Sequence, residues 1–315
     1  MKDFVFRVAF LACLFIVIPF LVIFFFSSEK DSEPKSIKEI TLYNHKNDCV
    51  TEIDLEKYIT GVVAAEMPAS FSENALKAQA VAARTYALRK VNADIDNHTG
   101  ADLCTDYAHC QAYYNDGELK KNWRDDYESN IKKIKKAVYE TRGEYLEYGG
   151  DYAITVFHSC SNGKTENAAD VWGGDIAYLK SVDSPGDKTA PKYKTKVRLT
   201  VDDFKNKLKQ HSEYNIDEAS EPIGEIRHTE GGNVSDAVIY NCDISGTDIR
   251  KIFGLRSTAF EIKSDEKNIT FSVTGNGHGV GMSQYGANEM GKTCDYKKIL
   301  SHYYPGTALK NMYKQ

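Results

Sequence analysis

Two neighbouring stretches of the chain carry apolar residues at the spacing of amphipathic helices. The first repeats them every three or four positions, at Leu55, Tyr58, Ile59, Val62 and Val63. Asp54 is suited to cap this helix at its start, and Pro68 predicts that the helix ends at Met67. The pattern therefore predicts a helix with one buried face over residues 54–67.

The second stretch predicts another helix, whose apolar residues are Leu76, Ala80, Ala83 and Ala87. Ser70 precedes Glu73 by three residues, a spacing typical of a capping box at a helix start. The two predicted helices are therefore separated by a short break that contains Pro68.

Glu66 lies in the last turn of the first predicted helix. A carboxylate there faces the negative end of the helix dipole and lies among Val63, Ala64 and Met67. Both effects oppose ionisation and raise the pKa of the carboxyl group. A raised pKa suits a general acid, so Glu66 is a candidate catalytic residue. The alternative is an exposed glutamate at a helix end, because most carboxylates in proteins are solvated.

The rest of the chain alternates between strand-like and helical patterns, which predicts an α+β fold. Strands are predicted over residues 37–43, 49–53, 144–148, 152–157, 234–240 and 269–273. The first two flank a polar turn and the next two flank Gly149-Gly150, so each pair predicts a hairpin. Helices are predicted over residues 123–138, 201–210, 247–253 and 284–290. Ser283 and Gly291 bound the last helix, and the polar segment 187–195 predicts a surface loop.

Residues 8–26 form an uninterrupted apolar run that follows Lys2 and Arg7. At about 1.5 Å per residue a helix here would span roughly 28 Å, close to the hydrocarbon core of a bilayer. No A-x-A-like cleavage site precedes Ser27, which favours an uncleaved signal anchor. We therefore expect residues 1–7 to be a cytoplasmic tail, 27–36 a polar linker and 37–315 an ectodomain outside the membrane.

The overall composition narrows the class of protein. The chain has 315 residues, of which 42% are hydrophobic, enough to build one large domain or two closely packed lobes. Its net charge is −5, its pI is about 5.9, and acidic and basic residues are mixed along it. The sequence has no basic tract, which argues against nucleic-acid binding.

The loop-like segment 92–117 carries His98, Cys104 and Cys110, with His109 beside the last cysteine. Two thiolates and an imidazole can supply three of the four ligands of a zinc ion, although the spacing is not a standard zinc-finger pattern. A disulfide between the cysteines is the first alternative, because the segment is expected to be extracytoplasmic. Unpaired thiols are the second. We favour zinc, in a mainly structural role, and the two alternatives remain open.

Several motifs of the chain resemble, in order and spacing, those of the SpoIID/LytB family. They are GVVAAEMP, KAQAVAARTYAL, HSCSNGKTENAADVWGG, YLKSVDSPGD, GNGHGVGMSQYGA and ILSHYYPGT. The resemblance runs from about Ile37 to the C-terminus. It implies a membrane-anchored lytic transglycosylase that cuts peptidoglycan glycan strands already stripped of stem peptides. The glutamate of the family's EMP motif is its catalytic acid, which corresponds here to Glu66.

The resemblance also implies residues that contact the glycan in a cleft: Arg84, Tyr86, Gln111, Tyr113, Tyr178, Lys180, His278, Gln284 and Tyr285. We expect Arg84 to act nearest to Glu66, the alternative being a surface arginine in an ion pair. His278 is expected to be the side chain near Glu66 that titrates close to neutral pH.

The polar loop 158–173 adds candidates of its own. Ser159 and Ser161 are suited to hydrogen-bond a glycan, and Trp172 to stack on a sugar ring. Cys160, two residues after His158, invites interpretation as a nucleophile, but a packed thiol is favoured.

The expected architecture is an ectodomain of two lobes that face each other across an extended groove, with Glu66 at its floor. Glu66 would protonate the bond between N-acetylmuramic acid (MurNAc) and N-acetylglucosamine (GlcNAc), leaving 1,6-anhydro-MurNAc ends. A muramidase that uses a second carboxylate, from Glu166, Asp102 or Asp106, is one alternative. A non-catalytic amidase enhancer, a role on the LytB side of the family, is the other.

The resemblance implies partners and a place of action as well. These are a sporulation peptidoglycan amidase and membrane-anchored engulfment proteins, at the mother-cell septal and engulfing membrane.

Overall fold

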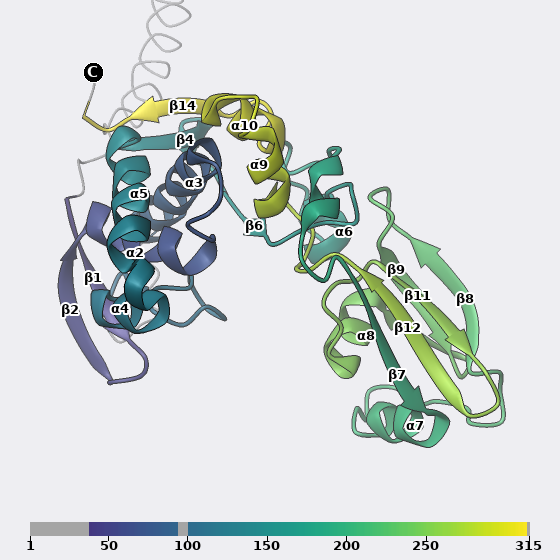
Figure 1. Ribbon diagram of the computed structural model, residues 1–315. Coiled ribbons are helices and arrows are strands. Elements are labelled where there is room, and N and C mark those ends of the chain that lie inside the picture. Colours follow the sequence, from purple (N-terminus) through teal and green to yellow (C-terminus); the bar gives the residue numbers. More distant parts are fainter. Residues whose placement is uncertain (1–37, 94–99, 314–315) are drawn as a thin grey trace, which may run out of the picture. The chain divides into compact units, whose positions relative to one another are not determined.

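Helix α3 (Glu73–Asn92) is the centre of the first of two hydrophobic cores (Figure 1). The computed structural model describes residues 38–93 and 100–313. The elements that pack against α3 include α2 (Leu55–Glu66), α5 (Tyr127–Glu140), β4 (Glu144–Tyr148), α9 (Gln284–Met290) and α10 (Tyr296–Tyr303). The predicted stripe is buried, and so are the neighbouring residues Ala75, Ala78 and Ala82. These small side chains let neighbours approach α3 from several sides.

The helix boundaries follow local signals with one exception. Asp54 caps α2 by accepting a hydrogen bond from the Lys57 N–H at 2.9 Å, and Met67 is extended, as Pro68 predicts. The predicted cap at Ser70 is wrong, because Ser72 caps α3 through the Ala75 N–H at 3.2 Å. The Phe71 N–H bonds to the Pro68 carbonyl, so the chain still turns where the capping box predicted a helix.

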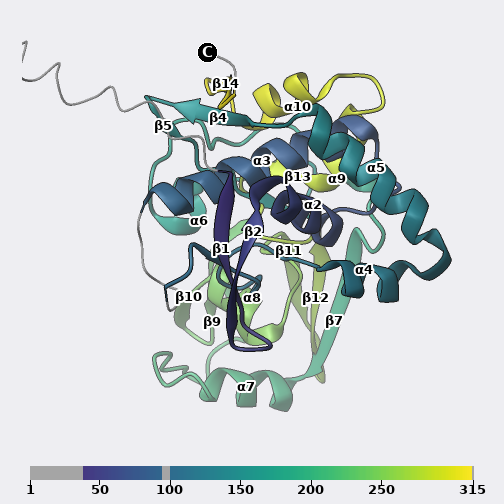
Figure 2. The same ribbon diagram turned by 90° about the vertical axis from the view of Figure 1, so that its left-hand side faces the viewer.

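Both predicted hairpins are present, although the second is shorter than expected. β1 (Glu39–Asn44) pairs antiparallel with β2 (Cys49–Asp54), which leads into α2 (Figure 2). β4 pairs antiparallel with β5 (Asp151–Tyr152) and with β14 (Ala308–Asn311). Two further short strands, β3 (Leu103–Cys104) and β6 (Phe157–His158), run parallel to β1 and to β13 (Met282–Ser283).

The helix predicted over residues 123–138 is α5, which begins at Tyr127, and Trp123 belongs to a separate helix that precedes it. α4 (Asp116–Trp123) ends at a 3₁₀ turn, η1 (Arg124–Asp126), before α5 begins. The φ angle of Arg124 is +48°, outside the helical region, and this breaks the helix. The apolar residues Ile131, Ile134 and Val138 are buried on α5, so their periodicity identified the second helix correctly.

The buried residues of the first core come from two parts of the chain, 40–179 and 280–304. Those of the second core come from residues 204–273, which lie between these two parts in the sequence. Its helices are α7 (Val201–Lys209) and α8 (Gly246–Phe253), the latter ended by Gly254 as predicted. One sheet has the order β10 (Cys242–Ser245), β9 (Val234–Ile239), β8 (Ile223–His228). The other has the order β11 (Phe260–Ser264), β12 (Asn268–Thr274), β7 (Lys194–Thr200). Phe204 of α7, Phe253 of α8 and Phe271 of β12 pack ring against ring in this core.

Mixed helices and strands confirm the α+β class, and two separate cores are present. Two short elements, α6 (Ala168–Trp172) and η2 (Pro185–Thr189), connect them. The extended groove stays a prediction. The predicted tail, membrane anchor and linker of residues 1–36 lie outside the described residues. In the described part of the chain no helix is both long and apolar enough to cross a membrane.

Candidate active site around Glu66

Glu66 is the last residue of α2, and both oxygens of its half-buried carboxyl group are hydrogen-bonded. Oε1 accepts the backbone N–H of Ala112 at 3.0 Å, and Oε2 accepts the Gln284 side-chain amide at 3.3 Å. Burial raises the pKa of Glu66, while the two hydrogen bonds stabilise the anion and reduce the rise. The expected raised pKa is confirmed, and burial is its main cause.

Three segments that are distant in sequence therefore meet at this carboxyl group. Gln284 is the first residue of α9, whose cap is Ser283, as the sequence predicted. Ser283 Oγ accepts the Gly286 N–H at 3.1 Å. This cap fixes the first turn of α9 and with it the Gln284 side chain. Gln284 is thus the predicted binding residue that the structure brings directly to Glu66.

Asp187 joins α9 to the polar loop from inside the protein. Its buried carboxylate accepts the Ser161 N–H at 2.6 Å and also the hydroxyls of Ser161 and Ser283. Asp187 belongs to the polar segment 187–195, which the sequence predicted to be a surface loop, so its burial corrects that prediction. Ser161 is consequently engaged with Asp187 in the interior rather than exposed to a ligand.

Arg84 is a structural residue, which corrects both expectations for it. The side chain is completely buried, where no glycan can reach it, and it is not a surface ion pair either. Its Nε and Nη2 bond both carboxylate oxygens of Glu56 at 2.9 and 2.5 Å, and Nη1 donates to the Glu144 carbonyl at 3.0 Å. The guanidinium thus ties α2 to α3 and to the start of β4.

The segment that carries Ala112 packs against α2 and α3. Tyr113 stacks on Tyr58 with ring centroids 5.6 Å apart, and a Cβ atom at Gly61 would collide with the Tyr113 ring. Tyr86 donates its hydroxyl to the His109 carbonyl at 3.4 Å. Gln111 is buried, and its amide has no hydrogen-bond partner in the described part of the chain. Tyr86, Gln111 and Tyr113 thus lie in or against the loop that delivers Ala112 to Glu66.

The same loop brings two cysteines and a histidine together. The ligand atoms of Cys104, His109 and Cys110 all lie within 4.8 Å of one another. His109 Nδ1 is 3.7 Å from Cys104 Sγ and 3.8 Å from Cys110 Sγ. His98 of the predicted set lies outside the described residues. His109, which the sequence offered only as a neighbour of Cys110, joins the cluster.

His278 does not titrate near neutral pH, which corrects the prediction for it. Its Nε2–H donates to the Phe157 carbonyl at 3.0 Å, and its Nδ1 accepts the Val280 N–H at 3.1 Å. Burial, and then the neighbouring His158, lower the pKa of His278 to about 3. The neutral ring supports Trp172, whose centroid lies 5.1 Å away and whose side chain is 49% exposed. Trp172 therefore remains available to stack on a sugar.

The other predicted residues differ in how much of them a ligand can reach. Tyr178 is buried and accepts the Ile154 N–H, whereas Lys180 is exposed and pairs with Asp175 at 2.5 Å. Tyr285 is half-buried and packs edge-on against Phe71. Its N–H bonds the carbonyl of Ser159, also half-buried. The pKa of the Cys160 thiol is raised to about 11 by burial, which confirms the favoured packed thiol.

Comparison with known proteins decides the family. The family model described as stage II sporulation protein matches residues 43–148. The chain is 40% identical to stage II sporulation protein D of Bacillus subtilis (strain 168), over 98% of this chain and 96% of that protein. The chain belongs to the stage II sporulation protein D family. Bacillus amyloliquefaciens has a protein of the same name that is 39% identical over the same shares of the two chains.

A more distant relative carries a different name. The amidase enhancer of Bacillus subtilis (strain 168) is 28% identical, over 80% of this chain and 40% of that protein. The family model covers Glu66, the residues of α3 and the cysteine loop, but ends before Gln284. The site around Glu66 therefore depends on a residue outside the matched range.

Proposed function

We propose that this family member is a lytic transglycosylase that cleaves MurNAc–GlcNAc bonds of peptidoglycan strands without stem peptides. The observation that carries the proposal is the half-buried Glu66 carboxyl group. Its pKa is raised by burial, and two hydrogen-bond donors from distant segments hold it. Such a group is protonated at a higher pH than a solvated glutamate, as a general acid requires.

One carboxyl group suffices for the proposed reaction. Protonated Glu66 gives its proton to the glycosidic oxygen as that oxygen leaves the anomeric carbon. The MurNAc 6-hydroxyl then closes on this carbon and returns its proton to Glu66, which forms 1,6-anhydro-MurNAc and restores the acid. The N–H of Ala112 and the amide of Gln284 stabilise the carboxylate that exists between the two proton transfers.

The muramidase alternative needs a second carboxylate, because hydrolysis usually uses two. Asp102 accepts hydrogen bonds from the N–H and hydroxyl of Thr41 at 2.6 and 2.8 Å, and so holds β1. Asp106 accepts the Ala108 N–H at 2.9 Å within its own loop. Glu166 is fully buried. Asp102 and Asp106 are therefore engaged in hydrogen bonds with neighbouring residues, and burial keeps Glu166 from a glycan, which favours the single-acid reaction.

The second candidate is a non-catalytic amidase enhancer, and the distant relative of that name favours it. The same product analysis separates the two functions. An enhancer leaves denuded glycan strands uncut by itself and increases cleavage only when an amidase is present.

The decisive experiment identifies the ends of the product. Purified protein incubated with denuded strands is expected to release fragments lighter by one water than hydrolytic fragments. Their ends should resist reduction by borohydride, because an anhydro ring has no free reducing end. Reducible ends would support the muramidase, and uncut strands the enhancer.

The proposal extends to place and partners. Residues 8–26 would anchor the protein in the mother-cell membrane at the septum and during engulfment, with residues 37–315 outside. An amidase of sporulation would supply the denuded strands, and membrane-anchored engulfment proteins would hold the enzyme at its place. A photocrosslinker in the ectodomain, activated in sporulating cells, would identify these neighbours.

The proposal includes a zinc ion bound by the cysteine loop. Zinc is bound at about 2.3 Å from sulfur and about 2.0–2.1 Å from nitrogen, which separates tetrahedral ligand atoms by roughly 3.5–4 Å. The sulfur–nitrogen distances of 3.7 and 3.8 Å at His109 fit this geometry. The ion would tie Cys104 to Cys110, two residues before the N–H that bonds Glu66. Its role would be structural, because the reaction proceeds on Glu66.

We expect purified protein to hold about one equivalent of zinc, and Cys104→Ser to lose it because a hydroxyl is a far poorer ligand than a thiolate. Metal analysis and thermal melting check this, with Cys242→Ser as the control, a half-buried cysteine of the second core. Negligible metal, together with thiols that appear only on reduction, would indicate a disulfide. If chelation stopped cleavage without lowering the melting temperature or the glycan affinity, the zinc ion would have a catalytic role rather than a structural one.

A further inference from the structure

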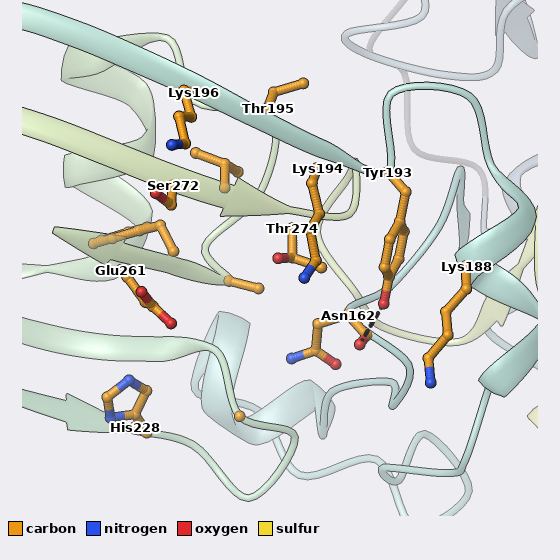
Figure 3. Close-up of a pocket in the computed structure, with 14 residues that line it drawn as sticks. Asn162, Lys188, Tyr193, Lys194, Thr195, Lys196, His228, Glu261, Ser272 and Thr274 are labelled. Carbon is orange, nitrogen blue, oxygen red and sulfur yellow. Dashed lines mark hydrogen bonds between the residues drawn. The ribbon is translucent and has the colours of Figure 1, made fainter.

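A large cavity lies over the outer face of the sheet formed by β11, β12 and β7 (Figure 3). Its volume is about 1070 Å³, and its lining includes no residue that contacts Glu66. In the view of Figure 3, Lys196, Lys194, Tyr193 and Lys188 follow one another across it. Ser272 and Thr274 lie beside the lysines on the sheet, and Asn162 comes from the polar loop.

The alternation of strand residues explains why this face is polar. On β7, Val197 and Leu199 pack into the second core, whereas Lys194 and Lys196 point the opposite way and are exposed. On β12 the residues opposite these lysines are hydroxyl-bearing: Thr274 pairs with Lys194, and Ser272 with Lys196. The sheet thus presents ammonium groups and hydroxyls side by side, and no large exposed hydrophobic residue of the described chain lines the cavity.

The charge of the cavity is positive, in a protein of net charge −5. Its lining contains three lysines, Lys188, Lys194 and Lys196, against a single acidic residue, Glu261. None of the three lysines has an ion-pair partner within 4 Å among residues 38–93 and 100–313, unlike Lys180 with Asp175. Three unneutralised ammonium groups around one cavity attract a ligand that carries several separated negative charges.

The neutral groups of the lining suit a sugar. Tyr193 donates its hydroxyl to the Asn162 carbonyl at 2.6 Å, which fixes its half-buried ring at the edge of the cavity. The hydroxyls of Ser272 and Thr274 form no hydrogen bond within the described part of the chain and are available to sugar hydroxyls. A fixed aromatic ring and several small donors are the usual components of a carbohydrate-binding surface.

We propose that this surface binds the lactyl carboxylates of MurNAc in peptide-free glycan strands, an inference that rests on the proposed function. In a strand with stem peptides each lactyl carboxyl is blocked as an amide, whereas in a denuded strand each MurNAc carries a free carboxylate. Lysine binds a carboxylate as a compact charge and gains nothing comparable from a neutral amide. The lysines therefore select denuded strands at a distance from the bond that is cut.

One loop connects this surface to the candidate active site. Asn162 of the cavity follows Ser161, and Asp187 joins Ser161 to Ser283, the cap of the helix that carries Gln284. A strand bound at the lysines is thus connected, through this loop, to the helix that positions Gln284, the hydrogen-bond partner of Glu66.

The test measures binding of uncut glycan to the full chain. Proteins carrying Glu66→Gln, alone or with Lys194→Gln and Lys196→Gln, are titrated with denuded strands and with strands whose lactyl carboxyls have been converted to methylamides. Lys207→Gln with Lys251→Gln is the matched control, since it removes two charges from α7 and α8 of the same core. Melting temperatures verify that all the proteins fold.

The pair at Lys194 and Lys196 is expected to weaken binding of denuded strands roughly two- to thirtyfold, the range for two exposed charge pairs. The control variant should bind denuded strands like the parent. The parent should bind the methylamide strands as weakly as the lysine variant binds denuded strands. The difference in affinity between parent and lysine variant should shrink as salt is added.

Equal binding of denuded strands by parent and lysine variant would overturn the inference, and cleavage to anhydro ends by the protein with Glu66 would show that the proposed function survives. A lysine variant that loses affinity for polyphosphate or for vesicles of phosphatidylglycerol, but not for glycan, would also overturn it. Absence of both binding and cleavage of glycan would remove the proposed function and this inference together.

Discussion

Glycan cleavage is expected to fall about 10²- to 10⁴-fold when Glu66 is replaced by glutamine, the usual cost of losing general acid catalysis. The amide is nearly isosteric with the carboxyl group but cannot transfer the proton. Its oxygen can still accept the Ala112 N–H, and the Gln284 amide can turn to accept its NH₂ group. Fold and glycan affinity should therefore remain.

The pH dependence of stability gives the Glu66→Gln variant a second readout. Burial raises the pKa of Glu66 in the folded protein above its unfolded value. Between these two values the folded state binds the proton more tightly than the unfolded state, so ionisation costs stability as pH rises. Glu66→Gln should therefore be more stable than the parent above the folded pKa, and the gain should vanish below the unfolded pKa.

Glu52→Gln is a suitable control, because Glu52 is an exposed glutamate on β2. It should leave cleavage unchanged. Cleavage by Glu66→Gln at a rate close to the parent's would remove Glu66 from the mechanism.

The largest loss of stability is expected from Arg84→Ala, at about 3–5 kcal/mol in the free energy of unfolding. Removing the guanidinium leaves the Glu56 carboxylate largely buried without its two charge-assisted hydrogen bonds. It also opens a cavity beside α2, α3 and β4. Chemical denaturation of parent and variant measures the difference.

Two companion variants distinguish a structural role from a glycan contact. Arg84→Met combined with Glu56→Met should recover much of the loss, because removing both partners leaves no unpaired buried charge. Arg84→Lys retains the charge but not the planar fork, so it should be less stable than the parent yet bind glycan equally well when folded. If Arg84→Lys weakened glycan binding at an unchanged melting temperature, Arg84 would be a glycan contact rather than a structural residue.

The sequence alone determined the features that depend on neighbouring residues. Asp54, Ser283 and Gly254 bound their helices as predicted, because capping and left-handed C-termini involve groups only a few residues apart. The placement of Glu66 in the last turn of α2 followed from the same signals, and so did the direction of its pKa shift. Ser72 rather than Ser70 caps α3, although the glutamate three residues after Ser70 favoured the earlier serine.

The tertiary structure decided which polar residues face one another. Arg84 and Glu56 are 28 residues apart, Ser283 and Asp187 are 96 apart, and Gln284 and Glu66 are 218 apart. Hydrophobic periodicity distinguishes a buried face from an exposed one, but a buried polar residue breaks the pattern and does not reveal its partner. His278 shows the same limit, because its low pKa arises from burial and from the neighbouring His158, which only the fold brings beside it.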